Sequence, residues 1–246
     1  MKLITSKDNA FIKSVLKLKT KKGRLKANEF ILDGYRIVKH ALENDIAISS
    51  IIMTEDFYKS HDLDFNNIVV TSDAIMKTLV ETETPQGILA IVKIEEVPLR
   101  EGPVLFLDKI QDPGNLGTLI RTAEAAGFGG VILRKGCTDP YSQKSIRSSM
   151  GSIVSIPVLM GRDIDDLMKL DYKIYGAALE GGKPYRDFTY DVKTLLIIGN
   201  EGNGITDEVL DICHERIYIP MKGDVESLNA SIAGGILMFE IAACVS

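Results

Sequence analysis

Apolar residues along the first 95 positions alternate between two spacings. Short apolar runs, typical of strands, occur at residues 29–32, 48–53, 68–70 and 87–94. Apolar residues recur three or four positions apart, as on one face of a helix, over residues 8–22, 35–44 and 72–80. Because each amphipathic element must bury its apolar face against a neighbour, this alternation predicts a small α/β sandwich domain over residues 1–95.

The alternation stops at residues 96–103, which hold two prolines and a glycine among polar residues. Such a composition is typical of a linker. Beyond it, strands are predicted at residues 104–107, 131–133, 173–179, 195–198 and 217–219. Helices are predicted at residues 115–126, 142–150, 164–170, 206–213 and 227–245. The run at residues 104–107 is apolar at every position, as in a strand buried on both faces of a parallel sheet, so we predict a second α/β domain over residues 104–246.

Composition excludes several classes of protein. No run of about 18 apolar residues appears, so we expect no membrane span. Polar residues follow the N-terminal methionine at once, which is unlike a secretory signal peptide. The cysteines are Cys137, Cys213 and Cys244. Their odd number and irregular spacing predict free thiols in a reduced, cytoplasmic protein that holds no metal.

The charge is unevenly distributed along the chain. The net charge of −5 argues weakly against a nucleic-acid partner, but no acidic residue lies between Asp8 and Glu29. Seven basic residues lie in that interval: Lys13, Lys17, Lys19, Lys21, Lys22, Arg24 and Lys26. A basic segment on an acidic protein predicts a surface that attracts phosphates. A solvated helix face would have the same composition, so this segment alone leaves both interpretations open.

Three segments that follow predicted strands are rich in glycine and asparagine, and the first is residues 112–123. It places Asn115 near a helix start and Arg121 six residues later, nearly two helical turns on. Both side chains can therefore reach the same region of the protein. An asparagine cap and a surface arginine would leave the same pattern.

The second and third segments are residues 198–205 and 217–233. The second delivers Glu201 into a glycine-rich loop that lacks both the P-loop sequence and the order of a dinucleotide fingerprint. In the third, Ser227 can cap the last helix, which places Asn229 in its first turn. Ligand sites in open α/β sheets lie at the carboxyl ends of the strands, so these segments are candidates for one site. Plain loops and simple capping are the alternatives.

Together these segments resemble the three signature motifs of the SpoU (TrmH-like) branch of the SPOUT RNA methyltransferases. Residues 112–123, 198–202 and 219–231 match motifs 1, 2 and 3 in order. Residues 1–95 are similar to the substrate-binding domain of ribosomal-protein-L30 type that often precedes the catalytic domain. The resemblance implies a trefoil-knotted parallel α/β domain, a homodimer with active sites at the subunit interface, and S-adenosyl-L-methionine (S-adenosylmethionine) as cofactor.

The resemblance also implies a reaction and site residues. The expected reaction is 2′-O-methylation of a ribose in structural RNA, with ribosomal RNA favoured. The expected catalytic residues are Arg121, Asn115, Glu201, Ser227 and Asn229. The expected cofactor contacts are Leu179, Gly199, Ile219 and Leu228. The expected RNA contacts are Lys13, Lys17, Lys21, Lys22, Arg24, Lys144 and Arg147, with Arg134 and Lys135 beside them.

Elementary chemistry limits the role of Arg121. A guanidinium is effectively always protonated, so we expect it to hold a phosphate or the developing oxyanion rather than to act as a base. Glu201 could orient it through a charge-assisted pair. The alternatives are a transfer RNA 2′-O-methyltransferase, a base-modifying relative, a non-catalytic RNA-binding protein with the same fold, and a nucleotide-dependent oxidoreductase. The missing dinucleotide fingerprint argues against the last of these.

Overall fold

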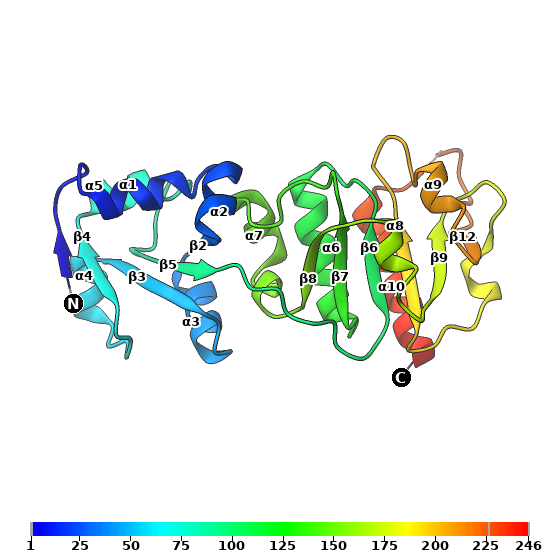
Figure 1. The fold of residues 1–246 in the computed structure, drawn as a ribbon, viewed down its shortest axis with the longest axis horizontal. Coiled ribbons are helices and arrows are strands. Elements are labelled where there is room, and N and C mark those ends of the chain that lie inside the picture. The colour runs from blue at the N-terminus through cyan, green and yellow to red at the C-terminus, as the bar shows by residue number, and fades with distance from the viewer. Residues whose placement is uncertain (1, 226, 246) are drawn as a thin grey trace. The chain divides into compact units, whose positions relative to one another are not determined.

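The structure is a computed structural model that describes residues 2–225 and 227–245. The chain forms two compact units (Figure 1). The N-terminal unit comprises the chain up to Glu95 together with Tyr141–Arg147, and the C-terminal unit comprises Glu96–Pro140 and the chain from Ser148 onward. Residues 141–147 are thus a part of the first unit that the sequence did not indicate.

The predicted linker, residues 96–103, is hydrogen-bonded to the C-terminal unit. The backbone N–H of Arg100 donates to Gly129 O at 2.9 Å, and the N–H of Gly129 donates to Pro103 O at 2.7 Å. The Arg100 guanidinium also donates to Ser155 O at 2.6 Å. Most of this stretch has no regular secondary structure, but these bonds tie it to the second unit.

The N-terminal unit is built on a five-stranded mixed sheet in the order β1-β4-β3-β5-β2. Its strands are β1 (Lys2–Ile4), β2 (Glu29–Asp33), β3 (Ile48–Thr54), β4 (Ile68–Thr71) and β5 (Ile88–Lys93). Its helices are α1 (Ala10–Lys17), α2 (Lys21–Ala27), α3 (Tyr35–Glu43), α4 (Glu55–Ser60) and α5 (Asp73–Leu79). The α/β sandwich is as predicted, although β1 and α4 were not.

The predicted helix over residues 8–22 is two helices in the structure. Asn9 caps α1 by accepting a hydrogen bond from the N–H of Phe11 at 2.8 Å. Thr20 then starts α2, because its hydroxyl accepts from the N–H of Gly23 at 3.1 Å. A threonine oxygen that binds backbone N–H groups competes with helix continuation. The break leaves the apolar periodicity intact, so Val15 still packs in the core.

The C-terminal unit is built on a seven-stranded parallel sheet in the order β10-β12-β9-β11-β6-β7-β8. Its strands are β6 (Val104–Leu107), β7 (Gly130–Arg134), β8 (Val158–Arg162), β9 (Lys173–Ala177), β10 (Lys183–Pro184), β11 (Thr194–Ile198) and β12 (Glu215–Tyr218). The central strands β6 and β11 are buried at every position, which confirms the prediction of a parallel sheet. The edge strands β8 and β10 were not predicted.

Helices cover both faces of this sheet (Figure 1). They are α6 (Pro113–Ala125), α8 (Ile164–Leu167), α9 (Asp207–Leu210) and α10 (Ala230–Val245). Most of α7 (Gln143–Ser149) belongs to the N-terminal unit. Leu167 of α8 and Val209 of α9 pack against Ile197 of β11. Gly234 of α10 lies against the next residue, Ile198, and against Leu119 of α6. Since successive strand residues point to opposite faces, α8 and α9 lie on one face and α6 and α10 on the other.

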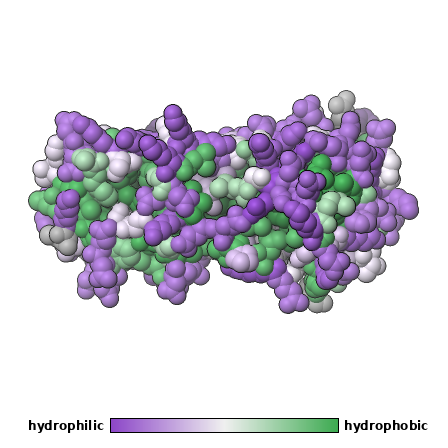
Figure 2. Space-filling view, viewed as in Figure 1, coloured by the Kyte–Doolittle hydropathy of each residue, from purple (hydrophilic) through white to green (hydrophobic). Residues whose placement is uncertain are grey.

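Polar side chains cover most of the face shown in Figure 2, with apolar patches between them, as on ordinary globular surfaces. Within residues 2–225 and 227–245, no helix is long and apolar enough to cross a membrane. The trefoil knot implied by the resemblance stays a prediction.

Candidate active site

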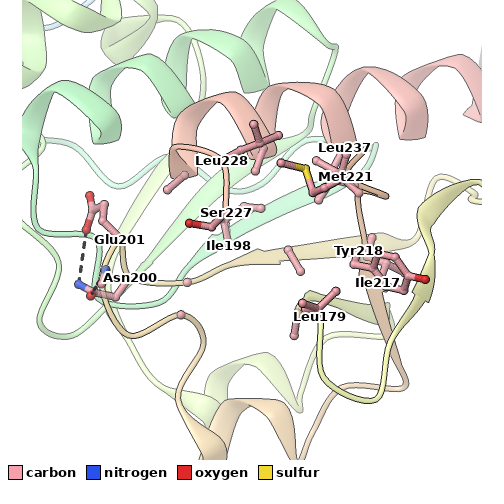
Figure 3. A pocket seen from close by; sticks show the side chains of 18 residues that line it. Leu179, Ile198, Asn200, Glu201, Ile217, Tyr218, Met221, Ser227, Leu228 and Leu237 are labelled. Atoms are coloured by element: carbon pink, nitrogen blue, oxygen red, sulfur yellow. Dashed lines mark hydrogen bonds between the residues drawn. The ribbon is translucent and has the colours of Figure 1, made fainter. Parts of the chain in front are cut away.

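A cavity of about 290 Å³ lies where the carboxyl ends of β9, β11 and β12 meet the start of α10 (Figure 3). Its wall includes apolar side chains from these elements, among them Ile198, Ile217 and Leu237. All four predicted cofactor contacts line it: Leu179, Gly199, Ile219 and Leu228. Residues from separate parts of the chain therefore converge on a single cavity at the sheet edge where ligand sites are expected.

The loop after β11 owes its shape to Gly199. A Cβ atom there would lie 2.2 Å from the carbonyl carbon of Gly204 and from the N of Ile205. The loop closes on itself through Asn200, whose N–H donates to Gly204 O at 2.9 Å and whose O accepts from Gly204 N–H at 2.9 Å. Only glycine at position 199 permits this closure, and the closed loop exposes its backbone to the cavity.

Glu201 ties this loop to the first motif. Its carboxylate accepts from the backbone N–H groups of Gln111 and Asp112, each at 3.1 Å, and from Asn115 Nδ2 at 3.1 Å. Burial by itself raises the pKa of the Glu201 carboxyl, but the hydrogen bonds outweigh it and hold the pKa below its ordinary value. Glu201 is therefore an anionic anchor for motif 1.

Asn115 continues the connection to the third motif. Its Oδ1 accepts from Asn229 Nδ2 at 3.1 Å, and Asn229 Oδ1 accepts from the N–H of Ser231 at 2.9 Å. A carboxylate only accepts and a helix N-terminus only donates. Both amides are therefore held in one orientation along the chain from Glu201 to α10. We call Glu201, Asn115 and Asn229 the amide relay.

The helices that Ser227 and Asn115 could cap are capped by other residues in the structure. Asn229, not Ser227, precedes the first residue of α10, and its side chain accepts from the exposed N–H groups. Ser227 stays outside the helix and lines the cavity. At the first motif, Asp112 caps α6 by accepting from Asn115 N–H at 2.8 Å. Because Asp112 caps the helix, the Asn115 side chain is available to the amide relay.

The predicted pair between Glu201 and Arg121 is not present among the described residues. Arg121 is exposed on α6, and its guanidinium makes no hydrogen bond or ion pair with residues 2–225 or 227–245. The Glu201 oxygens are instead occupied by Asn115 and two backbone N–H groups. The structure thus joins three predicted catalytic residues by hydrogen bonds, whereas Arg121, on the same helix as Asn115, makes no such bond to the described residues.

The predicted RNA contacts divide into exposed and buried side chains. Lys17, Lys21 and Lys22 are exposed, and Lys13, also exposed, pairs with Asp8 at 2.8 Å. Arg24 contradicts the prediction, because its side chain is buried and its Nη1 donates to Leu18 O at 2.7 Å. A buried guanidinium that stabilises a helix end cannot also bind a phosphate in solvent.

The second basic segment also contains both exposed and buried side chains. Lys144 is exposed, and Arg147, half-exposed, lies 3.9 Å from Glu81. Arg134 is only 5% exposed and pairs with Asp108 at 2.9 Å. The expectation that Arg134 contacts RNA is therefore wrong, because its charge is already neutralised inside the C-terminal unit.

Three residues that shape the site were not predicted from the sequence: Asn200, Lys109 and Gln111. Asn200 Nδ2 donates to Lys109 O at 2.9 Å, and Lys109 adopts a left-handed backbone with φ of 57°. Gln111 Nε2 donates to Lys109 O at 3.0 Å and to Gly136 O at 2.7 Å. The signal for Asn200 was its place in a glycine-rich loop. No local pattern marks a left-handed lysine.

Relatives with known names match the chain over nearly its full length. It is 37% identical over 246 residues to the 23S rRNA (guanosine(2553)-2′-O)-methyltransferase RlmP of Bacillus subtilis, covering 98% of this chain and 99% of that protein. The AdoMet-bound rRNA methyltransferase from Sinorhizobium meliloti has a TM-score of 0.88 and 30% identity, over 98% of this chain and 97% of that one. AviRb from Streptomyces viridochromogenes, a SpoU methyltransferase in complex with the cofactor AdoMet, has a TM-score of 0.84 and 27% identity, over 96% and 97% of the two chains.

Family profiles match both parts of the chain. Residues 9–90 match the MRM3-like substrate binding domain, and residues 102–239, more than half of the chain, match the SpoU rRNA methylase family. The cavity and the amide relay lie within the second of these matches. The chain therefore belongs to the SpoU rRNA methylase family and carries an MRM3-like substrate-binding domain ahead of its catalytic domain.

Proposed function

We propose that this protein transfers a methyl group from S-adenosylmethionine to a ribose 2′-oxygen of ribosomal RNA. The observation that carries the proposal is the amide relay, Glu201 to Asn115 to Asn229, beside a cavity lined by Leu179 and Leu228. A non-catalytic RNA-binding protein would have no need for three motifs fixed to one another at a cavity. The ribosomal 2′-O-methyltransferase of Bacillus subtilis supports the choice of RNA.

The residues around the cavity fit S-adenosylmethionine. Ile217, Leu228 and Leu237 offer apolar surface for an adenine ring, and the loop at Gly199 offers backbone hydrogen-bonding groups. A mostly apolar cavity with a few fixed polar groups is typical of a cofactor site. When bound there, the cofactor supplies an electrophilic methyl group on a positively charged sulfur.

Arg121 is the proposed catalytic arginine. Its donors are free of partners within the described residues, and its position on α6 follows Asn115 by nearly two turns. Such a guanidinium can hold an RNA phosphate or the oxyanion that develops as the hydroxyl attacks. Glu201 is an unsuitable base, because its carboxylate already accepts from Gln111, Asp112 and Asn115. Water or an acceptor on the RNA then takes the proton.

The N-terminal unit supplies the proposed RNA-binding surface. Lys17, Lys21 and Lys22 lie exposed on α1 and α2, and none of them forms an ion pair with residues 2–225 or 227–245. Unpaired lysines attract phosphates through counterion release. A ribosomal RNA substrate also supports the cytoplasm as the proposed compartment.

We also propose that the protein is a homodimer, with α10 at the interface. Most residues of this helix are apolar, with no polar face opposite an apolar one, and such a helix is normally buried. Yet Ile232, Ile236 and Phe239 on one stripe are 55%, 37% and 54% exposed. A second copy that packs on this stripe would cover it.

The test is transfer of labelled methyl from S-adenosylmethionine to total RNA, with ribosomal and transfer fractions kept separate, followed by nucleoside analysis. Label in a 2′-O-methylated nucleoside of the ribosomal fraction is the expected result. Label in the transfer RNA fraction alone would show that the substrate is transfer RNA and not ribosomal RNA. The absence of both label and cofactor binding would overturn the proposal.

A further inference from the structure

A buried cluster of charged side chains lies at the carboxyl ends of β6 and β7. Asp108, directly after β6, is fully buried, and Arg134, the last residue of β7, is 5% exposed. Arg134 Nη1 donates to Asp108 Oδ1 at 2.9 Å. Breaking a buried pair by removing one partner leaves a charge without compensation, which is strongly destabilising. The pair is therefore fixed in place.

Both charged groups converge on Thr206, at the far end of the loop that begins at Gly199. Asp108 Oδ2 accepts from the N–H and from the hydroxyl of Thr206, each at 2.8 Å. Arg134 Nη1 donates to the oxygen of that hydroxyl, also at 2.8 Å. Thr206 precedes α9, but its side chain makes no hydrogen bond to that helix. Its hydroxyl is used for the cluster instead.

Carboxylates on two other elements complete the surroundings of Arg134. Its Nη2 donates to Glu208 Oε1 at 2.5 Å, and its Nε donates to Asp163 Oδ1 at 3.2 Å. Burial by itself lowers the pKa of Arg134, but hydrogen bonds to Asp108 and Glu208 outweigh it and raise the pKa. All the donors in these bonds lie on one rigid planar fork, which a lysine could not reproduce.

The loop between Gly199 and Thr206 is consequently fastened at two places to the segment that joins β6 to α6. Glu201 fastens its first half to the start of α6, and Thr206 fastens its end to Asp108. Four consecutive loop residues, 199–202, line the cavity, as does Gly204. Glycine-rich backbone has little stiffness of its own, so the two attachments determine where its groups lie.

We infer that Asp108, Arg134 and Thr206 form a latch that holds the cofactor-binding loop in its binding shape, so that they are positioning residues for the reaction. The inference rests on the proposed function, because it takes S-adenosylmethionine as the occupant of the cavity. It assigns a role to an arginine that belongs to none of the three signature motifs.

The test compares three variants of the full chain by direct titration with S-adenosylmethionine in a calorimeter. Thr206→Val removes only the hydroxyl, Thr206→Ser keeps it, and Thr194→Val is the matched control. Thr194 is also buried and accepts from Asp191 N–H at 3.1 Å, but it lies at the opposite end of β11. The melting temperature of each variant is measured alongside.

We expect Thr206→Val to weaken cofactor affinity about tenfold, the effect of losing a hydrogen bond to a charged group. Thr206→Ser and Thr194→Val should bind S-adenosylmethionine as tightly as the unchanged protein does. This should hold even if Thr194→Val lowers the melting temperature as much as Thr206→Val does. The KM for cofactor should rise in Thr206→Val while the KM for RNA stays constant.

Unchanged affinity in Thr206→Val, or an equal loss in Thr194→Val, would overturn the latch while leaving the proposed function standing. An unsubstituted protein that binds no S-adenosylmethionine would instead overturn the proposed function, and the latch with it.

Discussion

Asn229 Nδ2 donates to Asn115 Oδ1 at 3.1 Å across 114 residues of sequence. Neither amide could hold this geometry alone, because an unrestrained asparagine amide can flip and exchange its oxygen acceptor with its nitrogen donor. Glu201 fixes one end by accepting from Asn115 Nδ2, and the N-terminus of α10 fixes the other by donating to Asn229 Oδ1. The three motifs of the catalytic domain are thus one hydrogen-bonded unit.

Replacing Arg121 tests its direct role in the chemistry. Arg121→Ala should lower kcat by about a hundredfold, as for loss of a group that stabilises developing negative charge. Cofactor affinity should be unchanged, since Arg121 does not line the cavity. Steady-state kinetics with RNA and calorimetry with cofactor measure the two effects. Arg162→Ala, at the end of β8, is the control, and a fall of less than about tenfold for Arg121→Ala would exclude a direct role.

The contribution of Glu201 to stability should depend on pH. Its folded-state pKa lies below the ordinary 4.5, so its stabilising effect is fully present above that value. The effect is lost as the pH falls through the lower, folded-state pKa. The melting-temperature difference between the unchanged protein and Glu201→Gln should therefore be largest near neutral pH and shrink in acid. A difference that is constant with pH would show that the carboxylate charge is not what stabilises the loop.

The two glycines of the second motif should differ sharply in their tolerance of alanine. At Gly199 an added Cβ would lie 2.2 Å from backbone atoms of Gly204 and Ile205, so Gly199→Ala should displace the loop and abolish cofactor binding. At Gly202 the nearest atom to an added Cβ is Asn200 Oδ1 at 3.6 Å, an ordinary contact. Gly202→Ala should therefore bind cofactor normally. Equal binding by both variants in calorimetry would contradict the proposed cavity.

Exposed lysines of the N-terminal unit should set the salt dependence of RNA binding. The triple variant Lys17→Ala, Lys21→Ala, Lys22→Ala should weaken RNA binding and reduce the slope of log K against log salt by about one unit for each phosphate that is no longer neutralised. The control is Lys39→Ala with Lys59→Ala, whose side chains already pair with Glu43 and Glu55. Filter binding over a salt series measures both. An unchanged slope in the triple variant would place the RNA elsewhere.

The exposed stripe of α10 should control the oligomeric state. Phe239→Glu places a charge on a residue that is 54% exposed in one copy, so it should produce monomers if a second copy covers the stripe. Met168→Glu, which alters another exposed apolar residue of the same unit, should leave a dimer intact. Sedimentation velocity distinguishes the two. A monomeric unsubstituted protein would refute the proposed homodimer.

Much of the site was predictable from sequence because its motifs are local. Asn115, Glu201 and Asn229 each stand beside glycines or helix starts that follow apolar strands, and parallel strands bring their carboxyl ends to one sheet edge. The Val-Leu-Phe-Leu run of β6 is apolar at each position, which predicted a strand buried on both faces. All four predicted cofactor residues line the cavity for this reason.

Local pattern could not decide which basic residue is solvated and which is buried. Lys22 and Arg24 are neighbours in one basic segment, yet Lys22 is exposed, and Arg24 is buried with Leu18 O as a partner. Arg134 was expected at an RNA surface and is neutralised by Asp108 instead. Residues 141–147 likewise belong to the N-terminal unit, through hydrogen bonds such as that of Gln143 Nε2 to Ile31 O at 2.9 Å.

The sequence by itself thus determined the parallel sheet and the family, and it predicted four residues that line the cavity. Periodicity and glycine placement are properties of short segments, so they can be recognised without knowing how those segments are arranged in space. Tertiary structure alone decided that Glu201 holds Asn115 rather than Arg121, and that Asn229 rather than Ser227 caps α10. Hydrogen-bond partners are chosen by the proximity of groups far apart in the chain, and that proximity exists only once the sheet has assembled.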